Sequence, residues 1–260
     1  MANRDIILDV NKVYLNFGGI LAIAGVSFKV YKGEIFSIIG PNGAGKTSIL
    51  NTITGIYFPS KGKILYKGID ITKMLVHKRS TMGLVRTFQN LELFKGMTVL
   101  DNLMLSRHNF LNYGLISSIF YFGKTLKQEV IHRKRVEEVI DFLNLSSYRK
   151  KHVFELSYGI QKRVELARAL CLEPELILLD EPMAGMNSEE TEDMARYIID
   201  INEEMGVTVI LIEHDMNVVM DLSSRVMALD FGEKVCEGLP EEVAKDKRVI
   251  SAYLGEEKWI

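Results

Sequence analysis

The chain has 260 residues, of which 47% are hydrophobic and 25% are charged, and its formal net charge is −2. This composition is typical of a folded globular protein and excludes disordered, collagen-like and low-complexity chains. The nearly balanced charge gives no electrostatic reason to expect nucleic acid as a partner, and two cysteines are too few for a disulfide framework or a four-cysteine zinc site.

The N-terminal third is predicted to consist mainly of strands. Residues 6–13 are rich in β-branched side chains, residues 26–31 alternate apolar and polar, and residues 35–39 form a short, nearly all-apolar run. A glycine-rich turn follows, and residues 46–54 have a helical pattern that ends at Gly55. A buried strand, a glycine turn and a helix form the first half of a βαβ unit.

The middle of the chain, about residues 97–148, has helical spacing and many charges, with an amphipathic pattern over residues 133–142. We therefore expect a helical subdomain that is inserted into an α/β core. The apolar stretch at residues 110–122 is much shorter than the roughly 20 apolar residues that span a bilayer, so we expect a soluble chain.

Two later segments, residues 176–179 and 207–212, are continuously apolar, which is typical of strands buried on both faces of a parallel sheet. A helical pattern precedes each of them, over residues 161–171 and 189–205. Ionisable residues follow both strands directly. In open α/β sheets this carboxyl edge is where ligands bind, so we expect a functional site there.

Residues 40–47 have the sequence GPNGAGKT, which fits the phosphate-binding pattern G-x-x-x-x-G-K-[ST]. Backbone N–H groups of such a loop surround phosphate oxygens, and the helix that follows adds its positive end. Lys46 supplies a positive charge for the β- and γ-phosphates, and Thr47 offers a hydroxyl to Mg²⁺. A chance glycine loop is the alternative, but its place between a buried strand and a helix favours a nucleotide site.

Asp180 and Glu181 follow the strand at residues 176–179 directly. In this position Asp180 would hold Mg²⁺ through water, and Glu181 would act as a general base on the attacking water. A pair of helix-capping residues is the alternative interpretation. The phosphate-binding loop upstream favours the catalytic one.

Three more residues are candidates for contacts with a nucleotide. Gln89 lies where the core gives way to the helical insertion, and its amide can orient water or bind Mg²⁺; a surface glutamine is the alternative. His214 follows the strand at residues 207–212 and can hydrogen-bond a γ-phosphate, or it is a structural histidine. Ser157 is a predicted N-cap that either only caps a helix or forms a second phosphate site, on this chain or on a partner.

In this order the motifs resemble those of the ATP-binding-cassette (ABC) ATPases, and the match covers nearly the whole chain. Residues 40–48 are similar to the Walker A motif and residues 176–181 to Walker B. Gln89 is similar to the Q-loop glutamine, residues 156–160 to the signature motif, and His214 to the H-loop histidine. Several motifs in the family order are far more specific than the phosphate-binding loop alone.

A closer resemblance is to the LivG-type ATPase subunits of branched-chain amino-acid importers. It is carried by the sequences RTFQN at residues 86–90, LSYG at 156–159, IEHDM at 212–216 and AYLG at 252–255. Two departures stand out from the general family pattern. The signature has Tyr158, which LivG-type subunits share, and also Ile160 in place of glutamine, with Gln161 one position later; the D-loop at residues 184–187 ends in Asn187 instead of aspartate.

The resemblance implies one ABC ATPase domain over residues 1–260. Its fold is α/β, with a P-loop NTPase (RecA-like) core, an N-terminal antiparallel β-subdomain and an inserted α-helical subdomain. The core is expected over residues 1–89 and 162–260, and the helical insertion, with the signature motif, over residues 90–161.

The resemblance also assigns roles. Glu181, His214 and Gln89 are the expected catalytic residues, and Thr47, Gln89 and Asp180 are the expected Mg²⁺ ligands. Phe17 is expected to stack on adenine, with Tyr14 as the other candidate. The remaining expected ATP contacts are Gly40, Pro41, Asn42, Gly43, Ala44, Gly45, Lys46, Thr47, Ser48, Ser157 and Gly159.

The mechanism that the resemblance implies needs two cassettes, this chain and a second copy or a paralogue. They face each other head to tail, and each ATP lies between the phosphate-binding loop of one chain and Ser157 and Gly159 of the other. ATP-driven closure would power two membrane permease subunits at the cytoplasmic face, which receive solute indirectly from an extracytoplasmic binding protein.

Other pathways stay open for the same catalytic residues. They include a urea-type importer, an exporter of lipid or lipopolysaccharide, and a soluble ATPase that transports nothing. The near-neutral charge and the absence of a long coiled-coil pattern disfavour a soluble ATPase that acts on nucleic acid. A P-loop kinase is disfavoured because it has no need of the LSYG segment or of His214.

Overall fold

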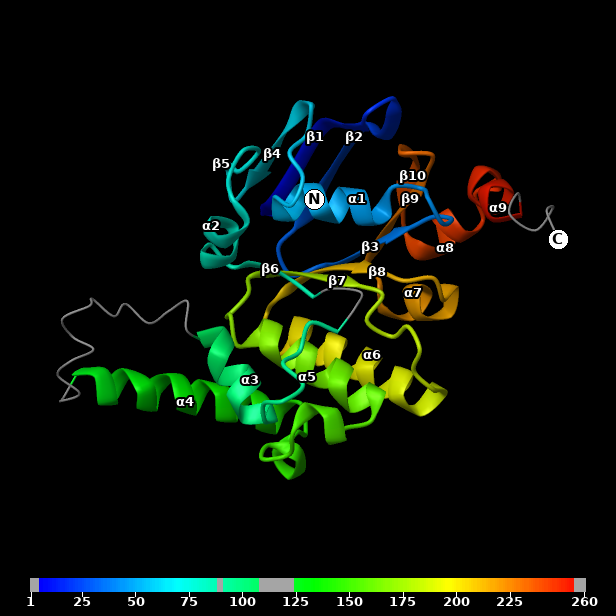
Figure 1. Cartoon of the computed structure of the whole chain (residues 1–260). Coiled ribbons are helices and arrows are strands. Elements are labelled where there is room, and N and C mark those ends of the chain that lie inside the picture. The colour runs from blue at the N-terminus through cyan, green and yellow to red at the C-terminus, as the bar shows by residue number, and fades with distance from the viewer. Residues whose placement is uncertain (1–4, 88–90, 108–123, 255–260) are drawn as a thin grey trace.

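The computed structural model describes residues 5–87, 91–107 and 124–254. Figure 1 shows an antiparallel sheet at the top, a mixed sheet in the middle and a layer of helices below, with helix α1 between the two sheets. The two sheets and the helices bury most large apolar side chains between them. Among the described residues, none of the helices combines the length and the apolar character needed to cross a bilayer.

The upper sheet has the strand order β2-β1-β4-β5, and its strands pair antiparallel. Its long strands β1 and β2 pair along most of their length, although several register shifts interrupt the pairing. One face packs on the core, as the alternation of buried and exposed residues shows. The strands are β1 (Ile6–Phe17), β2 (Ile20–Tyr31), β4 (Lys61–Tyr66) and β5 (Ile69–Asp70).

The mixed sheet has the strand order β10-β9-β3-β8-β7-β6, and all pairs except β9 with β10 are parallel. Every residue of the central strands β3, β7 and β8 is buried, because layers cover both faces of the sheet. The strands are β3 (Ile35–Ile39), β6 (Leu84–Arg86), β7 (Leu176–Asp180), β8 (Thr208–Ile212), β9 (Arg225–Asp230) and β10 (Glu233–Gly238).

The helices divide between the layers (Figure 1). Helix α1 packs between the sheets, α2 packs against β6 at the edge of the mixed sheet, α3 to α6 form the lower layer, and α8 and α9 lie beside β9 and β10. The bounds are α1 (Lys46–Thr54), α2 (Val76–Thr81), α3 (Val99–Ser106), α4 (Lys124–Phe142), α5 (Tyr158–Leu170), α6 (Ser188–Glu203), α7 (Met216–Leu222), α8 (Pro240–Ala244) and α9 (Lys247–Leu254), with short 3-10 turns at Ser146–Tyr148 and Val153–Glu155.

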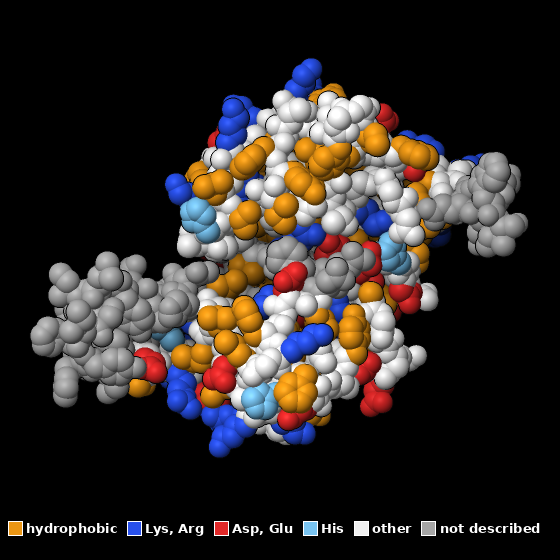
Figure 2. All heavy atoms as spheres, viewed as in Figure 1, with side chains coloured by type: hydrophobic (Ala, Val, Ile, Leu, Met, Phe, Trp, Pro, Cys, Tyr) orange, Lys and Arg blue, Asp and Glu red, His pale blue; other side chains and the backbone are white. Residues whose placement is uncertain are grey.

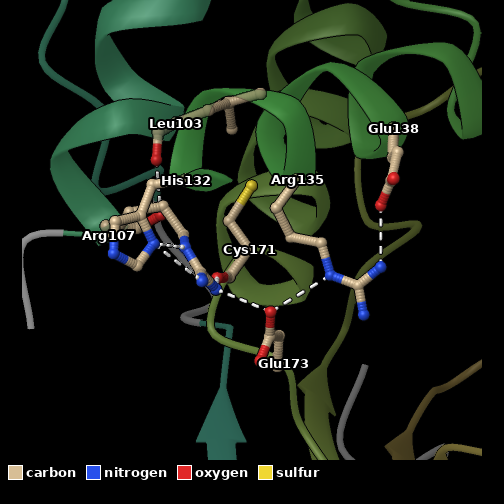
Figure 3. Close-up of polar contacts among 8 residues, drawn as sticks. Leu103, Arg107, His132, Arg135, Glu138, Cys171 and Glu173 are labelled. Carbon is tan, nitrogen blue, oxygen red and sulfur yellow. Dashed lines mark hydrogen bonds and ion pairs between the residues drawn. The ribbon is translucent and has the colours of Figure 1, made fainter. Parts of the chain in front are cut away.

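A polar network with a buried Arg107–His132 pair connects α4 to the rest of the lower layer (Figure 3). Arg107, the residue after α3, donates to Nδ1 of His132 on α4 and to the carbonyl oxygen of Cys171 at 2.6 Å. Glu173 pairs with both Arg107 and Arg135, each at 3.1 Å. Burial and the neighbouring Arg107 charge lower the pKa of His132, which keeps the ring neutral as an acceptor.

The visible face carries both hydrophobic and charged side chains. Figure 2 shows hydrophobic side chains over the upper, β-rich half of the visible face, and Lys and Arg side chains along its lower edge. Exposed apolar residues of the upper half include Phe17, Ile56, Tyr57 and Phe58. Such groups occur on most soluble surfaces and imply no site by themselves.

The structure confirms the predicted fold class, since it combines an antiparallel sheet, a largely parallel sheet and a helical layer. The strand at residues 35–39 and the helix at residues 46–54 have the predicted bounds. Both N-terminal strands are longer than predicted, and the helix expected over residues 161–171 begins earlier, at Tyr158. The division into a core and an insertion at residues 90–161 stays a prediction.

Candidate functional site

Three parallel strands end at the same edge of the mixed sheet. β8 pairs with both β3 and β7, so that Ile212 lies opposite Ile38 on one side and Asp180 on the other. The segments that follow these strands therefore begin side by side. This arrangement brings Gly40, Asp180 and His214 to the carboxyl edge of the sheet, where open α/β sheets bind ligands.

The loop between β3 and α1 depends on glycine at both ends. Gly40 has a φ of +150° and Gly45 a φ of +99°, which L side chains rarely adopt. A Cβ on Gly40 would lie 2.2 Å from the carbonyl oxygen of Leu229, and a Cβ on Gly45 would lie 2.7 Å from that of Ala22. Only glycine therefore lets this loop lie so close to β2 and β9.

Lys46 places a positive charge inside the loop. It is the first residue of α1 and is only 6% exposed. Its Nζ donates to the carbonyl oxygens of Gly40 at 2.6 Å and Pro41 at 2.8 Å. Because the first turn of α1 has no acidic residue, the ammonium and the positive end of the helix act together on this loop. The loop is therefore suited to binding phosphate groups.

A groove of about 470 Å³ runs along the loop. The start of β2, the loop, the start of α1, Glu181 and Phe231 all contribute to its lining. The predicted ATP contacts at residues 42–48 thus share one groove with the predicted general base. Its lining residues are Ile20, Leu21, Ala22, Asn42, Gly43, Ala44, Gly45, Lys46, Thr47, Ser48, Glu181 and Phe231.

Glu181 and His214 form a hydrogen-bonded pair at this edge. Glu181 has a positive φ of 50°, and its N–H donates to the carbonyl oxygen of Ile212 at 2.9 Å. Its Oε1 lies 2.5 Å from Nε2 of His214. A strained backbone at such a site is typical of a functional position. The carboxylate can accept a proton from water, and the imidazole can orient it.

Asp180 is completely buried at the end of β7. Burial raises its pKa, whereas the charge of Arg86, whose Nη2 lies 2.6 Å from Asp180 Oδ2, acts in the opposite direction. The other oxygen, Oδ1, has no hydrogen-bond partner within the described chain. A buried carboxylate oxygen without a hydrogen-bond partner fits Mg²⁺ or one of its bound waters, because Mg²⁺ prefers oxygen ligands and keeps several waters.

The described residues contain no cluster of three or more His, Cys, Asp or Glu side chains that is suited to a metal ion. A magnesium–nucleotide complex needs no such cluster, because phosphate oxygens and water supply most of its ligands.

Glu213 is a site residue that the motif analysis did not single out. It is 5% exposed, and its Oε1 accepts the N–H of Met183 at 2.9 Å while Oε2 accepts the N–H of His214 at 3.3 Å. Burial raises the pKa of Glu213, and these two N–H donors lower it. Glu213 therefore ties the segment after Glu181 to the segment that carries His214. Its position directly before His214 was the available sequence signal.

The structure places the predicted signature residues away from the groove of the same chain, since neither Ser157 nor Gly159 lines it. Ser157 caps α5 by accepting the N–H of Ile160 at 3.4 Å. Gly159 is buried, and a Cβ there would lie 2.2 Å from Oε1 of Glu190. The amide of Gln161 donates to the carbonyl oxygen of Leu156 at 2.8 Å, so this side chain stabilises the start of the helix.

Neither of the two candidates for the adenine contact lines the groove. Phe17 is 43% exposed, and its ring packs edge-on against Tyr57 with a centroid distance of 4.9 Å. Tyr14, the alternative, is half-buried, and its ring lies against Gly25. Gln89 lies outside the described residues.

Asn187, which departs from the family pattern, has a clear local role. Its Oδ1 accepts the N–H of Glu190 at 3.0 Å, and the Glu190 side chain accepts the N–H of Asn187 at 3.2 Å. This capping box starts α6 and offsets the loss of an aspartate at the N-cap, because asparagine and aspartate cap helices equally well.

The chain is similar to ATP-binding proteins of ABC transporters over most of its length. Residues 23–184 match the family model described as ABC transporter, and residues 233–258 match the model described as branched-chain amino acid ATP-binding cassette transporter. The chain is 39% identical to the high-affinity branched-chain amino acid transport ATP-binding protein BraF of Pseudomonas aeruginosa and 37% identical to LivG of Escherichia coli K12. Both alignments cover 96% of this chain and 98% of the relative.

Solved structures with the same architecture include a nucleotide-free ATP-binding cassette from an ABC transporter. It is 32% identical, with a TM-score of 0.84, and the alignment covers 95% of this chain and 98% of that one. A bacterial ABC transporter cassette solved as a dimer is 27% identical, with a TM-score of 0.73 over 90% of this chain and 98% of that chain.

Proposed function

The chain belongs to the ABC transporter family of ATP-binding proteins, and we propose that it hydrolyses ATP to power the import of branched-chain amino acids. Two relatives that share most of its length carry this transport in their names. The C-terminal match to a branched-chain amino acid cassette model supports the same solute class. The observation that carries the catalytic part is the Glu181–His214 pair, because Glu181 lines the same groove as Lys46.

ATP binds through its phosphates in this proposal. Lys46 leaves the carbonyl oxygens of Gly40 and Pro41 and turns to the β- and γ-phosphates, while the loop N–H groups surround their oxygens. Mg²⁺ would neutralise charge that develops on the phosphates during hydrolysis. Thr47 and Asp180 would hold it, together with Gln89.

Water attacks the γ-phosphate from the side of Glu181. The Glu181 carboxylate accepts the proton of the attacking water, and His214 holds the carboxylate and the terminal phosphate in line. Glu213 fixes the backbone of both segments through its two accepted N–H groups. The Glu181–His214 pair is therefore held in position before ATP binds, so these side chains need to move little during the reaction.

A second cassette completes the site. Because Ser157 and Gly159 do not line the groove of their own chain, we infer that they contact the γ-phosphate bound by a partner, either a paralogue or a second copy. The similarity to a cassette solved as a dimer supports this arrangement. ATP then lies between two chains and favours the closed dimer through its differential affinity for the two states.

Two membrane permease subunits complete the proposed transporter, and an extracytoplasmic solute-binding protein delivers the amino acid to them. The cassette would bind the permeases at the cytoplasmic face of the membrane through the lower helical layer and the Gln89 region. Hydrolysis and dimer opening would then reset the permeases.

The catalytic assignment is tested by measuring phosphate release from Glu181→Gln and Lys46→Ala. We expect a loss of 100-fold or more for Glu181→Gln, since a general base contributes about 10²–10⁴ in rate. Glu181→Gln should still bind ATP and accumulate as an ATP-bound dimer, whereas Lys46→Ala should bind it weakly. Glu138→Gln, an exposed residue on α4, is the control. Rates close to wild type in both site variants would refute the assignment.

The solute class is tested in liposomes that contain the cassettes and the permeases purified with this chain. Leucine-loaded binding protein should stimulate ATP hydrolysis. Stimulation by urea-loaded binding protein or by a lipid substrate instead would move the chain to one of the alternative pathways without changing its catalytic assignment.

A further inference from the structure

Asp180 has an internal counter-ion, Arg86. Nη2 of Arg86 lies 2.6 Å from Oδ2 of Asp180; the Arg86 side chain is 6% exposed and the Asp180 side chain is 0% exposed. Arg86 ends β6 and Asp180 ends β7, and the parallel pairing of these strands holds the two residues side by side. Since both groups are shielded from water, their interaction is much stronger than that of a surface ion pair.

The same guanidinium also reaches the helix that begins at the phosphate-binding loop. Nη1 of Arg86 donates to Oδ1 of Asn51 at 2.5 Å. Asn51 lies four residues after Thr47, so the two share one face of α1. The planar fork of an arginine fixes two partners at once, which a lysine ammonium does not do. Arg86 thus sets the position of Asp180 relative to α1.

This arrangement divides the two oxygens of Asp180 between two tasks. Oδ2 receives the guanidinium, while Oδ1 is buried and has no hydrogen-bond partner among the residues described. A buried acceptor without a partner is unfavourable. A metal-bound water would satisfy it, and it would do so without displacing Arg86.

We propose that Arg86 is a positioning residue for the magnesium site: it balances the charge of Asp180 and fixes its orientation before the metal arrives. The assignment of magnesium rests on the proposed function. The counter-ion role itself rests on the contacts of Arg86 with Asp180 and Asn51. The Asp180 carboxylate is therefore held in place before magnesium–ATP binds.

Three variants separate charge from geometry. Arg86→Met removes the charge and keeps most of the length, and Arg86→Lys keeps the charge and loses the fork. Arg86→Met with Asp180→Asn removes both charges. The matched control is Arg225→Met, because Arg225 Nη2 lies 2.7 Å from Oε1 of the buried Glu34 at the opposite end of β3.

The measurements are the melting temperature in EDTA and the Mg²⁺ concentration that gives half-maximal binding of a fluorescent ATP analogue. We expect Arg86→Met to melt on the order of 5–10 °C lower in EDTA, and the added Asp180→Asn to restore at least half of this loss. Arg86→Met and Arg86→Lys should need on the order of tenfold more Mg²⁺. Arg225→Met should melt lower but need the wild-type amount.

The proposal is overturned if Asp180→Asn restores nothing and the Arg86 variants need no more Mg²⁺ than wild type, because Arg86 then contributes packing alone. If Arg86→Met does not fold, the Mg²⁺ requirement of Arg86→Lys decides the question in the same way. Failure of wild type to bind the analogue would refute the proposed function instead, and melting of the double variant in EDTA would still test the counter-ion.

Discussion

Tyr253 connects the C-terminal helix α9 to the phosphate-binding loop, and removing its hydroxyl tests how much the loop depends on this contact. The N–H of Gly40 donates to the Tyr253 hydroxyl at 2.8 Å, and the ring packs against a small apolar cluster that includes Ile39 and Val249. Tyr253→Phe keeps the ring and its packing. It leaves the Gly40 N–H, which is buried at the end of β3, without this acceptor.

The expected cost follows from that one donor. A buried N–H that loses its acceptor costs about 1–3 kcal/mol. For a chain of this size, each kcal/mol lowers the melting temperature by about 2–4 °C. Without this contact the loop is less ordered before ATP binds, and ATP binding must then order it. If this ordering costs about 1 kcal/mol, ATP binds roughly fivefold more weakly.

The assay is a thermal melt together with a calorimetric titration of ATP into the Tyr253→Phe variant. Tyr148→Phe, in the helical layer, is the control, because its ring contacts Lys151 away from the loop. Unchanged melting temperature and unchanged ATP affinity in Tyr253→Phe would show that α9 does not support the loop, and the reasoning would be wrong.

Three further changes have defined outcomes. Arg79→Met should lower the melting temperature by about 6–12 °C. The Arg79 side chain is 1% exposed, and its guanidinium donates to four carbonyl oxygens around the end of α1, so the variant loses four charged hydrogen bonds. Equal melting temperatures of variant and wild type would contradict this. Gly45→Ala should bind ATP at least tenfold more weakly in the same titration, because its Cβ would press on the carbonyl oxygen of Ala22. For His132, the folded pKa is lowered, so below about pH 6.5 the unfolded chain takes up a proton that the folded chain does not. As the pH is lowered, the free energy of unfolding should therefore decrease more steeply in wild type than in His132→Gln. Parallel pH profiles of the two proteins would refute the role of the ring.

Some elements of the fold were predictable because strong local sequence signals mark where they begin and end. The strand at residues 35–39 and helix α1 lie between glycines, and Gly55, with a φ of +86°, ends the helix by donating its N–H to Asn51. The N-terminal strands were underestimated for the opposite reason. β1 contains register shifts and a positive φ at Lys12, so its alternation is irregular and the strand pattern in the sequence stops early.

The candidate site shows the same division. The glycine loop, Asp180, Glu181 and His214 are recognisable because each lies at the carboxyl end of a buried strand or within two residues of it. Arg86, 94 residues from Asp180 in sequence, and Tyr253, 213 residues from Gly40, are not recognisable in this way. Their contacts depend on strand order and on where the last helix packs, which a single sequence does not reveal.

The central claim is that the loop at residues 40–48 holds the phosphates of ATP through Lys46. Isothermal titration of magnesium–ATP into the purified chain and into Lys46→Ala measures this contact directly. The account predicts one site per chain, with binding at least tenfold weaker in the variant. Equal affinity in the two proteins, or no binding to the wild-type chain, would contradict it.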